Sequence, residues 1–107
     1  MIRGSVWWVD LDPTTGSEIQ KTRPAVIVSN DIANKALDRV VIVPLTSNTK
    51  FLYPGNAFVS VNGQKSRAVA DQIRAVDKAR LSNKLCDLSE GDMLAIDEAI
   101  KTHLAFV

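Results

Sequence analysis

The chain has 107 residues, of which 46% are hydrophobic and 23% are charged, and its formal net charge is +1. This length predicts one domain over residues 1–107, and the composition is typical of a globular protein and excludes a disordered one. The sequence pI of about 7.9 predicts no field that would attract nucleic acid by itself, since nucleic-acid-binding domains usually have a pI above about 9.

Cysteine content and hydropathy indicate where the protein acts. The single cysteine, Cys86, excludes a disulfide within the chain and favours a reducing compartment. The first residues contain no apolar run of signal-peptide length, and no stretch approaches the roughly 18 apolar residues of a transmembrane helix. We therefore expect a cytoplasmic protein that does not contact a membrane.

The first half of the chain is predicted to be mostly strands. Residues 5–11 alternate apolar side chains between two faces, as a strand does. Residues 25–29 form a near-continuous apolar run, which is typical of a buried strand. Asn30 is predicted to cap a short helical turn that reaches Leu37, and residues 40–45 are again rich in β-branched side chains.

The second half is predicted to hold a hairpin and the longest helix. Asn62-Gly63 is a strong turn signal that would pair residues 57–61 with 65–70, and the strand pattern is expected to continue through residues 71–76. Ser89 fits a helix N-cap, and apolar residues then recur at helical spacing through residues 90–104. About five or six short strands with a terminal helix indicate a mainly β fold with a C-terminal α-helix, a small and partly open β-barrel.

Most of the polar side chains that could take part in catalysis or binding lie in the loop between the first two strands and just after it. The sequence has no P-loop, dinucleotide fingerprint, metal-ligand spacing or G-x-S-x-G motif. The single histidine, His103, falls in the last turn of the predicted helix, where interaction with the helix C-terminus explains it. The remaining candidates form a set that needs no metal: Glu18, Arg23, Thr46 and Asp71.

These residue types suit chemistry at a phosphate. Arg23 can hold a phosphate in a bidentate manner and stabilise charge on its oxygens, while Thr46 and Ser47 supply hydroxyl donors. A nearby carboxylate can act as a general base. The set suits attack by an RNA 2′-hydroxyl on the adjacent phosphorus, a reaction that DNA cannot undergo.

Each residue also has a purely structural interpretation. Glu18 fits a solvated loop carboxylate, and Arg23 fits a surface ion pair of little energetic value. Thr46 and Ser47 fit the end of a strand, and Asp71 fits a cap for backbone groups at a bend. Spacing alone therefore predicts only a small β-rich domain with a charged loop.

Longer motifs carry a resemblance to a known family. The runs VWWVDLDPTTGSE, RPAVIVSND and VVIVPLTSN, in this order, strongly resemble the MazF/PemK family of toxin endoribonucleases. The downstream run ADQIRAVDKARL is similar to a later strand of the same family and its continuation. The resemblance covers residues from Ser5 to about Leu81, and the final helix fits the family by its pattern alone.

The resemblance implies a single MazF/PemK-like toxin domain over residues 1–107, with an SH3-like β-barrel and a homodimeric assembly. Members cut single-stranded RNA at short sequences without metal or another cofactor, and leave a 2′,3′-cyclic phosphate and a 5′-hydroxyl. A labile MazE-like antitoxin normally neutralises the toxin by laying a tail across the RNA groove of the dimer.

The resemblance also implies roles for individual residues. The family's catalytic arginine and threonine match Arg23 and Thr46, and its loop glutamate matches Glu18. Some members use an aspartate that matches Asp71. The remaining candidates are RNA contacts: Gln20, Lys21, Ser47, Asn48, Asp71 and Gln72.

Two departures from the family pattern bear on the mechanism. Some members carry a histidine directly after the loop glycine, where this chain has Ser17. Some also carry an arginine two residues before the aspartate, where this chain has Val69. The first departure excludes a histidine-assisted mechanism, and the second favours Glu18 over Asp71 as the base.

Two other functions fit the same fold. Gyrase-poisoning toxins bind a protein target and have no nuclease chemistry, and a non-catalytic barrel would bind RNA without cutting it. The combination of Glu18, Arg23 and Thr46 argues against the gyrase toxin, because a pure inhibitor needs no phosphate-holding group there. We therefore expect the toxin endoribonuclease of a type II toxin–antitoxin system.

Overall fold

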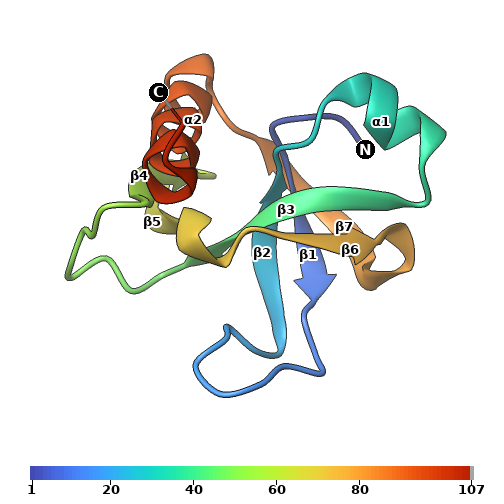
Figure 1. The fold of residues 1–107 in the computed structure, drawn as a ribbon, viewed down its shortest axis with the longest axis horizontal. Coiled ribbons are helices and arrows are strands. Elements are labelled where there is room, and N and C mark those ends of the chain that lie inside the picture. Colours follow the sequence, from blue (N-terminus) through green and yellow to red (C-terminus); the bar gives the residue numbers. More distant parts are fainter. Residues whose placement is uncertain (107) are drawn as a thin grey trace.

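A computed structural model describes residues 1–106 as a curled antiparallel sheet with a long C-terminal helix against one end (Figure 1). The strands are β1 (Ser5–Asp10), β2 (Thr22–Ile27), β3 (Arg39–Thr46), β4 (Asn56–Val61), β5 (Gln64–Val69), β6 (Arg74–Asp77) and β7 (Leu81–Asp87). The helices are α1 (Asp31–Ala36) and α2 (Glu90–Leu104), and two 3₁₀ turns are η1 (Ala70–Gln72) and η2 (Lys78–Arg80). Neither α-helix in residues 1–106 has the length and apolarity that a bilayer crossing requires.

The long strand β3 organises the sheet. The strand order is β4-β5-β3-β2-β1-β7, and β6 also pairs with β3. The first half of β3 pairs with β6, from Arg39↔Asp77 to Ile42↔Arg74, whereas Leu45 and Thr46 at its end pair with β5. All of these pairs are antiparallel, and the curled sheet stays open between β4 and β7. The predicted mainly β fold, a small SH3-like barrel with a C-terminal helix, is confirmed.

Two apolar clusters cover opposite faces of the central strands. The first contains Val6, Val26 and Val43 together with Met93 and Ile96 of α2. The second lies on the other face and combines residues of the segment from β1 to β3 with one residue each of β6 and β7. Its members are Val9, Leu11, Ala25, Ile27, Val40, Ile42, Val76 and Leu81. Because both faces are buried, β2 and β3 are nearly continuous apolar runs rather than alternating ones.

The local signals at three elements give the expected structure. The Oγ of Ser89 accepts the Asp92 N–H at 3.1 Å, and α2 begins directly after it. The Oδ1 of Asn30 accepts the Ala33 N–H at 2.8 Å at the start of α1. Asn62 and Gly63 have positive φ angles of 49° and 82°, as a tight hairpin turn requires.

One prediction in the second half is wrong, and one strand there was missed. The strand expected over residues 71–76 is interrupted, because Ala70–Gln72 forms η1 and β6 starts only at Arg74. This turn is needed because the chain leaves β4 and the end of β3 and then pairs with the opposite half of β3. The strand β7 was not expected, since LSNKLCD contains few strand-forming residues and lies at the edge of the sheet.

Candidate functional site

The β1–β2 loop is closed at its base by hydrogen bonds between its own two ends, and it is joined to η1 near its middle. The Leu11 N–H donates to the Lys21 carbonyl at 3.0 Å, and the Lys21 N–H donates to the Oδ1 of Asp12 at 3.0 Å. The Ile19 N–H donates to the Oε1 of Gln72 at 2.7 Å. A loop that is rich in polar residues is therefore held against η1.

Arg23 lies near the start of β2 and is half-buried. Its Nε donates to the Gln20 carbonyl at 3.2 Å, which orients the side chain from within the loop. Arg23 lines a cavity of about 450 Å³ together with Trp8, Thr46 and Ser47. The structure thus brings together two of the three expected catalytic residues, which come from different strands.

Thr46 is the last residue of β3, and its Oγ1 accepts the Asn48 N–H at 3.2 Å. The β2–β3 ladder ends at Ala25↔Pro44. Arg23 and Thr46 each lie two residues beyond this last pair, at the same end of the sheet. Pro24 and Leu45, the residues next to Arg23 and Thr46, also line the first cavity, which therefore lies at the end of the β2–β3 ladder.

The other acidic and amide candidates line a second cavity. Glu18, Asp71 and Gln72 surround a space of about 370 Å³ whose wall includes Pro44 and Arg74. The Oε1 of Glu18 accepts the Thr15 N–H at 2.5 Å. Pro44, which lines this second cavity, is next to Leu45, which lines the first, so the two cavities adjoin near the end of β3.

The predicted site residues therefore fall into two adjoining groups. Arg23, Thr46 and Ser47 share the first cavity, and Glu18, Asp71 and Gln72 share the second. Three further candidates are exposed on the loops beside them: Gln20, Lys21 and Asn48. The roles of all these residues stay predictions.

Sequence reasoning missed two arginines near this site. Arg74 lines the second cavity, and its Nη1 donates to the Leu11 carbonyl at 3.2 Å. Arg67 pairs directly with Thr46 in the β3–β5 ladder. The position of Arg67 could have been predicted from the Asn62-Gly63 turn, because a two-residue turn there sets Phe58 opposite Arg67 in the hairpin.

The arrangement places cationic, hydroxyl and carboxylate groups around an open surface of the sheet. A guanidinium and a hydroxyl side by side are suited to two oxygens of one phosphate. A carboxylate across that surface is suited to take a proton from a nucleophile. Within residues 1–106, no three His, Cys, Asp or Glu side chains gather in a group that could hold a metal ion.

Comparisons with known proteins identify the family of the chain. Residues 2–104 match the family described as PemK-like, MazF-like toxin of type II toxin–antitoxin system. The chain is 40% identical, over 97% of its length and 96% of the relative, to Endoribonuclease MazF9 of Mycobacterium tuberculosis.

Solved structures extend the comparison. An endoribonuclease from mycobacterial species, in complex with its cognate antitoxin, has a TM-score of 0.84 at 27% identity, with 100% of this chain and 97% of that chain covered. MazF from Deinococcus radiodurans has a TM-score of 0.87 at 22% identity, over 99% and 97% of the two chains, and so shows the same fold. The predicted family and the predicted enzyme class, a toxin endoribonuclease, are confirmed. The chain belongs to the PemK-like, MazF-like toxins of type II toxin–antitoxin systems.

Proposed function

We propose that this toxin cleaves single-stranded RNA at short sequences, without a metal ion, through attack by the 2′-hydroxyl. The observation that carries the proposal is the cavity shared by Arg23 and Thr46, which joins a phosphate-binding cation to a hydroxyl donor. The curated relative at 40% identity is named an endoribonuclease, which supports RNA as the substrate.

In the proposed step, phosphorus forms a bond to the 2′-oxygen and loses its bond to the 5′-oxygen. The 2′-oxygen attacks the adjacent phosphorus, and its proton passes to the carboxylate of Glu18. The bond from phosphorus to the 5′-oxygen then breaks. The leaving 5′-oxygen receives a proton through a network of hydrogen-bond donors bound at Arg23. The products are a 2′,3′-cyclic phosphate and a 5′-hydroxyl.

Arg23 and Thr46 act on the charge that builds during this step. The guanidinium of Arg23 binds the scissile phosphate and stabilises the pentacovalent transition state, and the hydroxyl of Thr46 holds a non-bridging oxygen. Donors that are fixed before the reaction need no reorganisation during it. The hydrogen bond from the Nε of Arg23 to the Gln20 carbonyl supplies part of that fixation.

Glu18 is the preferred general base over Asp71. The preference rests on the sequence, because this chain has Val69 where some family members carry an arginine two residues before the aspartate; each carboxylate accepts one hydrogen bond, Asp71 from the Nδ2–H of Asn56 and Glu18 from the Thr15 N–H. Exposed side chains on the two flanking loops then contact the RNA, together with Gln72 and Asp71: Gln20, Lys21, Ser47 and Asn48.

The partners follow from the family. We infer that a cognate MazE-like antitoxin neutralises this toxin, because a relative at 27% identity with a TM-score of 0.84 is in complex with its own antitoxin. We also propose that the chain acts as a single toxin domain in a homodimer, and that an RNA substrate places its activity in the cytoplasm.

The test is to incubate the purified protein with a single-stranded RNA, and with DNA of the same sequence, in EDTA. We expect the RNA to be cut and the DNA to stay intact. Arg23→Ala should lose cleavage, whereas Arg39→Ala, which removes an exposed arginine at the start of β3, should retain it. RNA that stays whole in every reaction would contradict the proposal and favour a gyrase-binding toxin or a non-catalytic RNA-binding barrel.

A further inference from the structure

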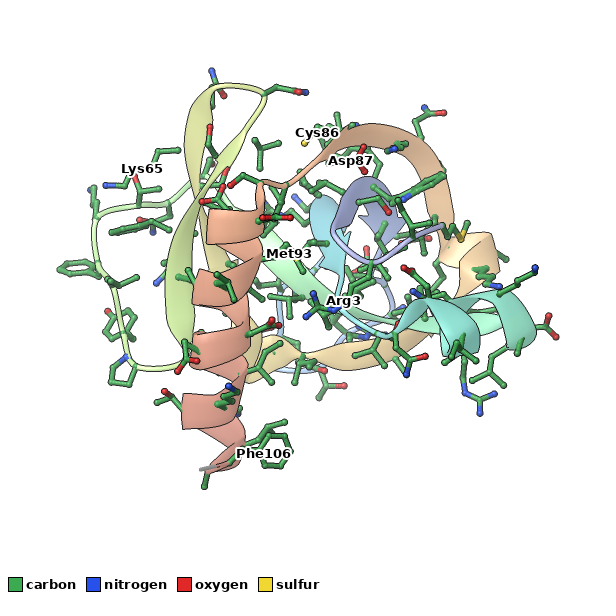
Figure 2. The ribbon with its side chains drawn as sticks, turned by 90° about the horizontal axis from the view of Figure 1, so that it is seen from above. Arg3, Lys65, Cys86, Asp87, Met93 and Phe106 are labelled. Carbon is green, nitrogen blue, oxygen red and sulfur yellow. The ribbon has the colours of Figure 1, made fainter. Side chains whose placement is uncertain are left out.

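Aromatic and basic side chains gather on the outer face of the β4–β5 hairpin and on the loop before it. We call this set the aromatic–basic surface, and its members are Phe51, Tyr53, Phe58, Lys65 and Arg67. Phe51 and Tyr53 are 60% and 55% exposed and lie next to each other, and contiguous exposed apolar groups often mark a binding surface. Figure 2 shows Lys65 projecting from the hairpin away from Met93 and the helix that carries it.

The rings and the cations of this surface are already in contact. The Nζ of Lys65 lies 3.9 Å from the ring centroid of Phe58, and the Cζ of Arg67 lies 5.7 Å from that of Tyr53. The rings of Phe51 and Tyr53 are 6.1 Å apart and tilted by 37°. Each cation is thus placed within reach of an aromatic face, where cation–π attraction holds the two groups together.

The same surface is continuous with the cleavage site. Arg67 is paired with Thr46 on one side and with Phe58 on the other. Directly paired residues of antiparallel strands project from the same face of the sheet. A row of side chains therefore leads from Phe58 through Arg67 to the hydroxyl that we place at the scissile phosphate.

Arg67 is oriented but not neutralised. Its Nη1 donates to the Oδ1 of Asn56 at 3.1 Å, and its buried Nε has no hydrogen-bond partner within residues 1–106. The ion pairs of these residues are Arg3–Asp97, Lys84–Asp87 and Lys101–Glu98. Among residues 1–106, no carboxylate forms an ion pair with Lys65 or Arg67, so both side chains are available to an anionic ligand.

We propose that the aromatic–basic surface binds the single-stranded RNA beside the scissile nucleotide, and this inference rests on the proposed function. Unpaired bases stack on Tyr53 and Phe58, and the neighbouring phosphates lie against Lys65 and Arg67. Cations interleaved with aromatic faces match a strand that alternates phosphates with flat bases. Because every base has such a face, this surface adds affinity that does not depend on sequence.

The test compares two probes with equal numbers of phosphates. One is a 2′-O-methyl uridine strand of roughly 12 nucleotides, a length within the usual site size, which cannot be cut because it lacks a free 2′-hydroxyl. The other is an abasic strand of the same length. We expect Tyr53→Leu and Phe58→Leu each to weaken binding of the uridine strand by about 5-fold or more and to leave the abasic strand unaffected.

A charge variant separates stacking from electrostatics. Lys65→Gln should weaken both strands equally and lower the slope of log affinity against log salt by about 0.7. The matched controls are Phe106→Leu, which changes an exposed ring beyond the end of α2 (Figure 2), and Lys35→Gln in α1. Both controls should bind the two strands as the wild type does. Phe58→Leu keeps an apolar side chain at its half-buried position, and the exposed Tyr53 gives a second variant that does not disturb packing.

Three results would overturn the inference. One is a wild-type protein that binds the uridine strand no more tightly than the abasic one. Another is an unchanged affinity for the uridine strand in both Tyr53→Leu and Phe58→Leu. The third is a loss of affinity for the antitoxin alone, which would assign the surface to that protein. Because neither probe is cut, these results are independent of cleavage: a protein that stacks the strand but never cuts RNA would contradict only the proposed function.

Discussion

The Ile19 N–H donates to the Oε1 of Gln72 at 2.7 Å, and this hydrogen bond joins the β1–β2 loop to η1. Both Ile19 and Gln72 line the cavity that also contains Glu18 and Asp71. Without Gln72, the Ile19 N–H would have to donate its hydrogen bond to water. Gln72 therefore positions the loop that carries the proposed general base.

Gln72→Met tests this positioning role, since methionine has a similar size but is only a weak acceptor. We expect cleavage to fall by about 10-fold, because a displaced catalytic group loses rate steeply. Amide hydrogen exchange at Ile19 should accelerate. Gln72→Glu retains an acceptor and should keep Ile19 protected, whereas wild-type exchange in Gln72→Met would show that the bond does not hold the loop.

Thr46→Val tests the hydroxyl at the proposed phosphate site. Valine has the same shape, so the fold is retained, but the donor to the non-bridging oxygen is lost. We expect the cleavage rate to fall by about 100-fold, the usual effect of removing one such donor. Thr46→Ser keeps the hydroxyl and should restore most of the rate. Equal rates in Thr46→Val and the wild type would remove Thr46 from the mechanism.

Gly55→Ala tests the contact between the β3–β4 loop and α2. Gly55 has a φ of +82°, and an added Cβ would lie 3.3 Å from the Cβ of His103. We expect a loss of about 1–2 kcal/mol in the free energy of unfolding, because side chains strain a positive φ, together with a further loss from the contact. Urea unfolding measures both.

Gly16→Ala is the matched control for that variant. Gly16 also has a positive φ, of +59°, but an added Cβ would meet nothing within 4 Å. We expect Gly16→Ala to lose less free energy of unfolding than Gly55→Ala. Measured against His103→Gly alone, the double variant Gly55→Ala/His103→Gly should recover the difference, because glycine lacks the Cβ that the added group would contact. Equal losses at Gly16 and Gly55 would show that the contact with His103 has no cost.

Ser89→Ala tests the start of α2. The Oγ of Ser89 accepts the Asp92 N–H, and removing such a cap costs about 1 kcal/mol. Ser89→Asn should retain most of the stability, since asparagine also accepts from the helix N-terminus. Ser82→Ala, at an exposed position of β7, should have little effect. An unchanged urea midpoint in Ser89→Ala would contradict this account of the helix start.

Elements with strong local signals could be predicted from the sequence. The Ser89 cap and the helical spacing of Met93, Ile96 and Ile100 mark α2, and Asn62-Gly63 marks the β4–β5 hairpin. In contrast, β7 has no such pattern, because an edge strand exposed to solvent needs few apolar residues. The turn η1 is imposed by the change of pairing partner between β5 and β6, which is a property of the whole sheet.

The residues of the candidate site could be named from the sequence, but their grouping could not. Arg23 and Thr46 line one cavity because antiparallel pairing of β2 and β3 sets both residues at the same end of the sheet. Glu18 shares a second cavity with Asp71, and a hydrogen bond holds its loop to Gln72. The link from Arg67 through Asn56 to Asp71 joins three separate segments. No local pattern encodes such a link, since each residue has an ordinary role within its own segment.

The central claim is that the groups around Arg23 and Thr46 cleave RNA through its own 2′-hydroxyl. The most direct measurement is mass spectrometry of the fragments that the wild-type protein releases from one single-stranded RNA in EDTA. We predict that the upstream fragment ends in a 2′,3′-cyclic phosphate and the downstream fragment begins with a 5′-hydroxyl. Fragments that end in a 3′-hydroxyl and begin with a 5′-phosphate, or that appear only when a metal ion is supplied, would contradict the account.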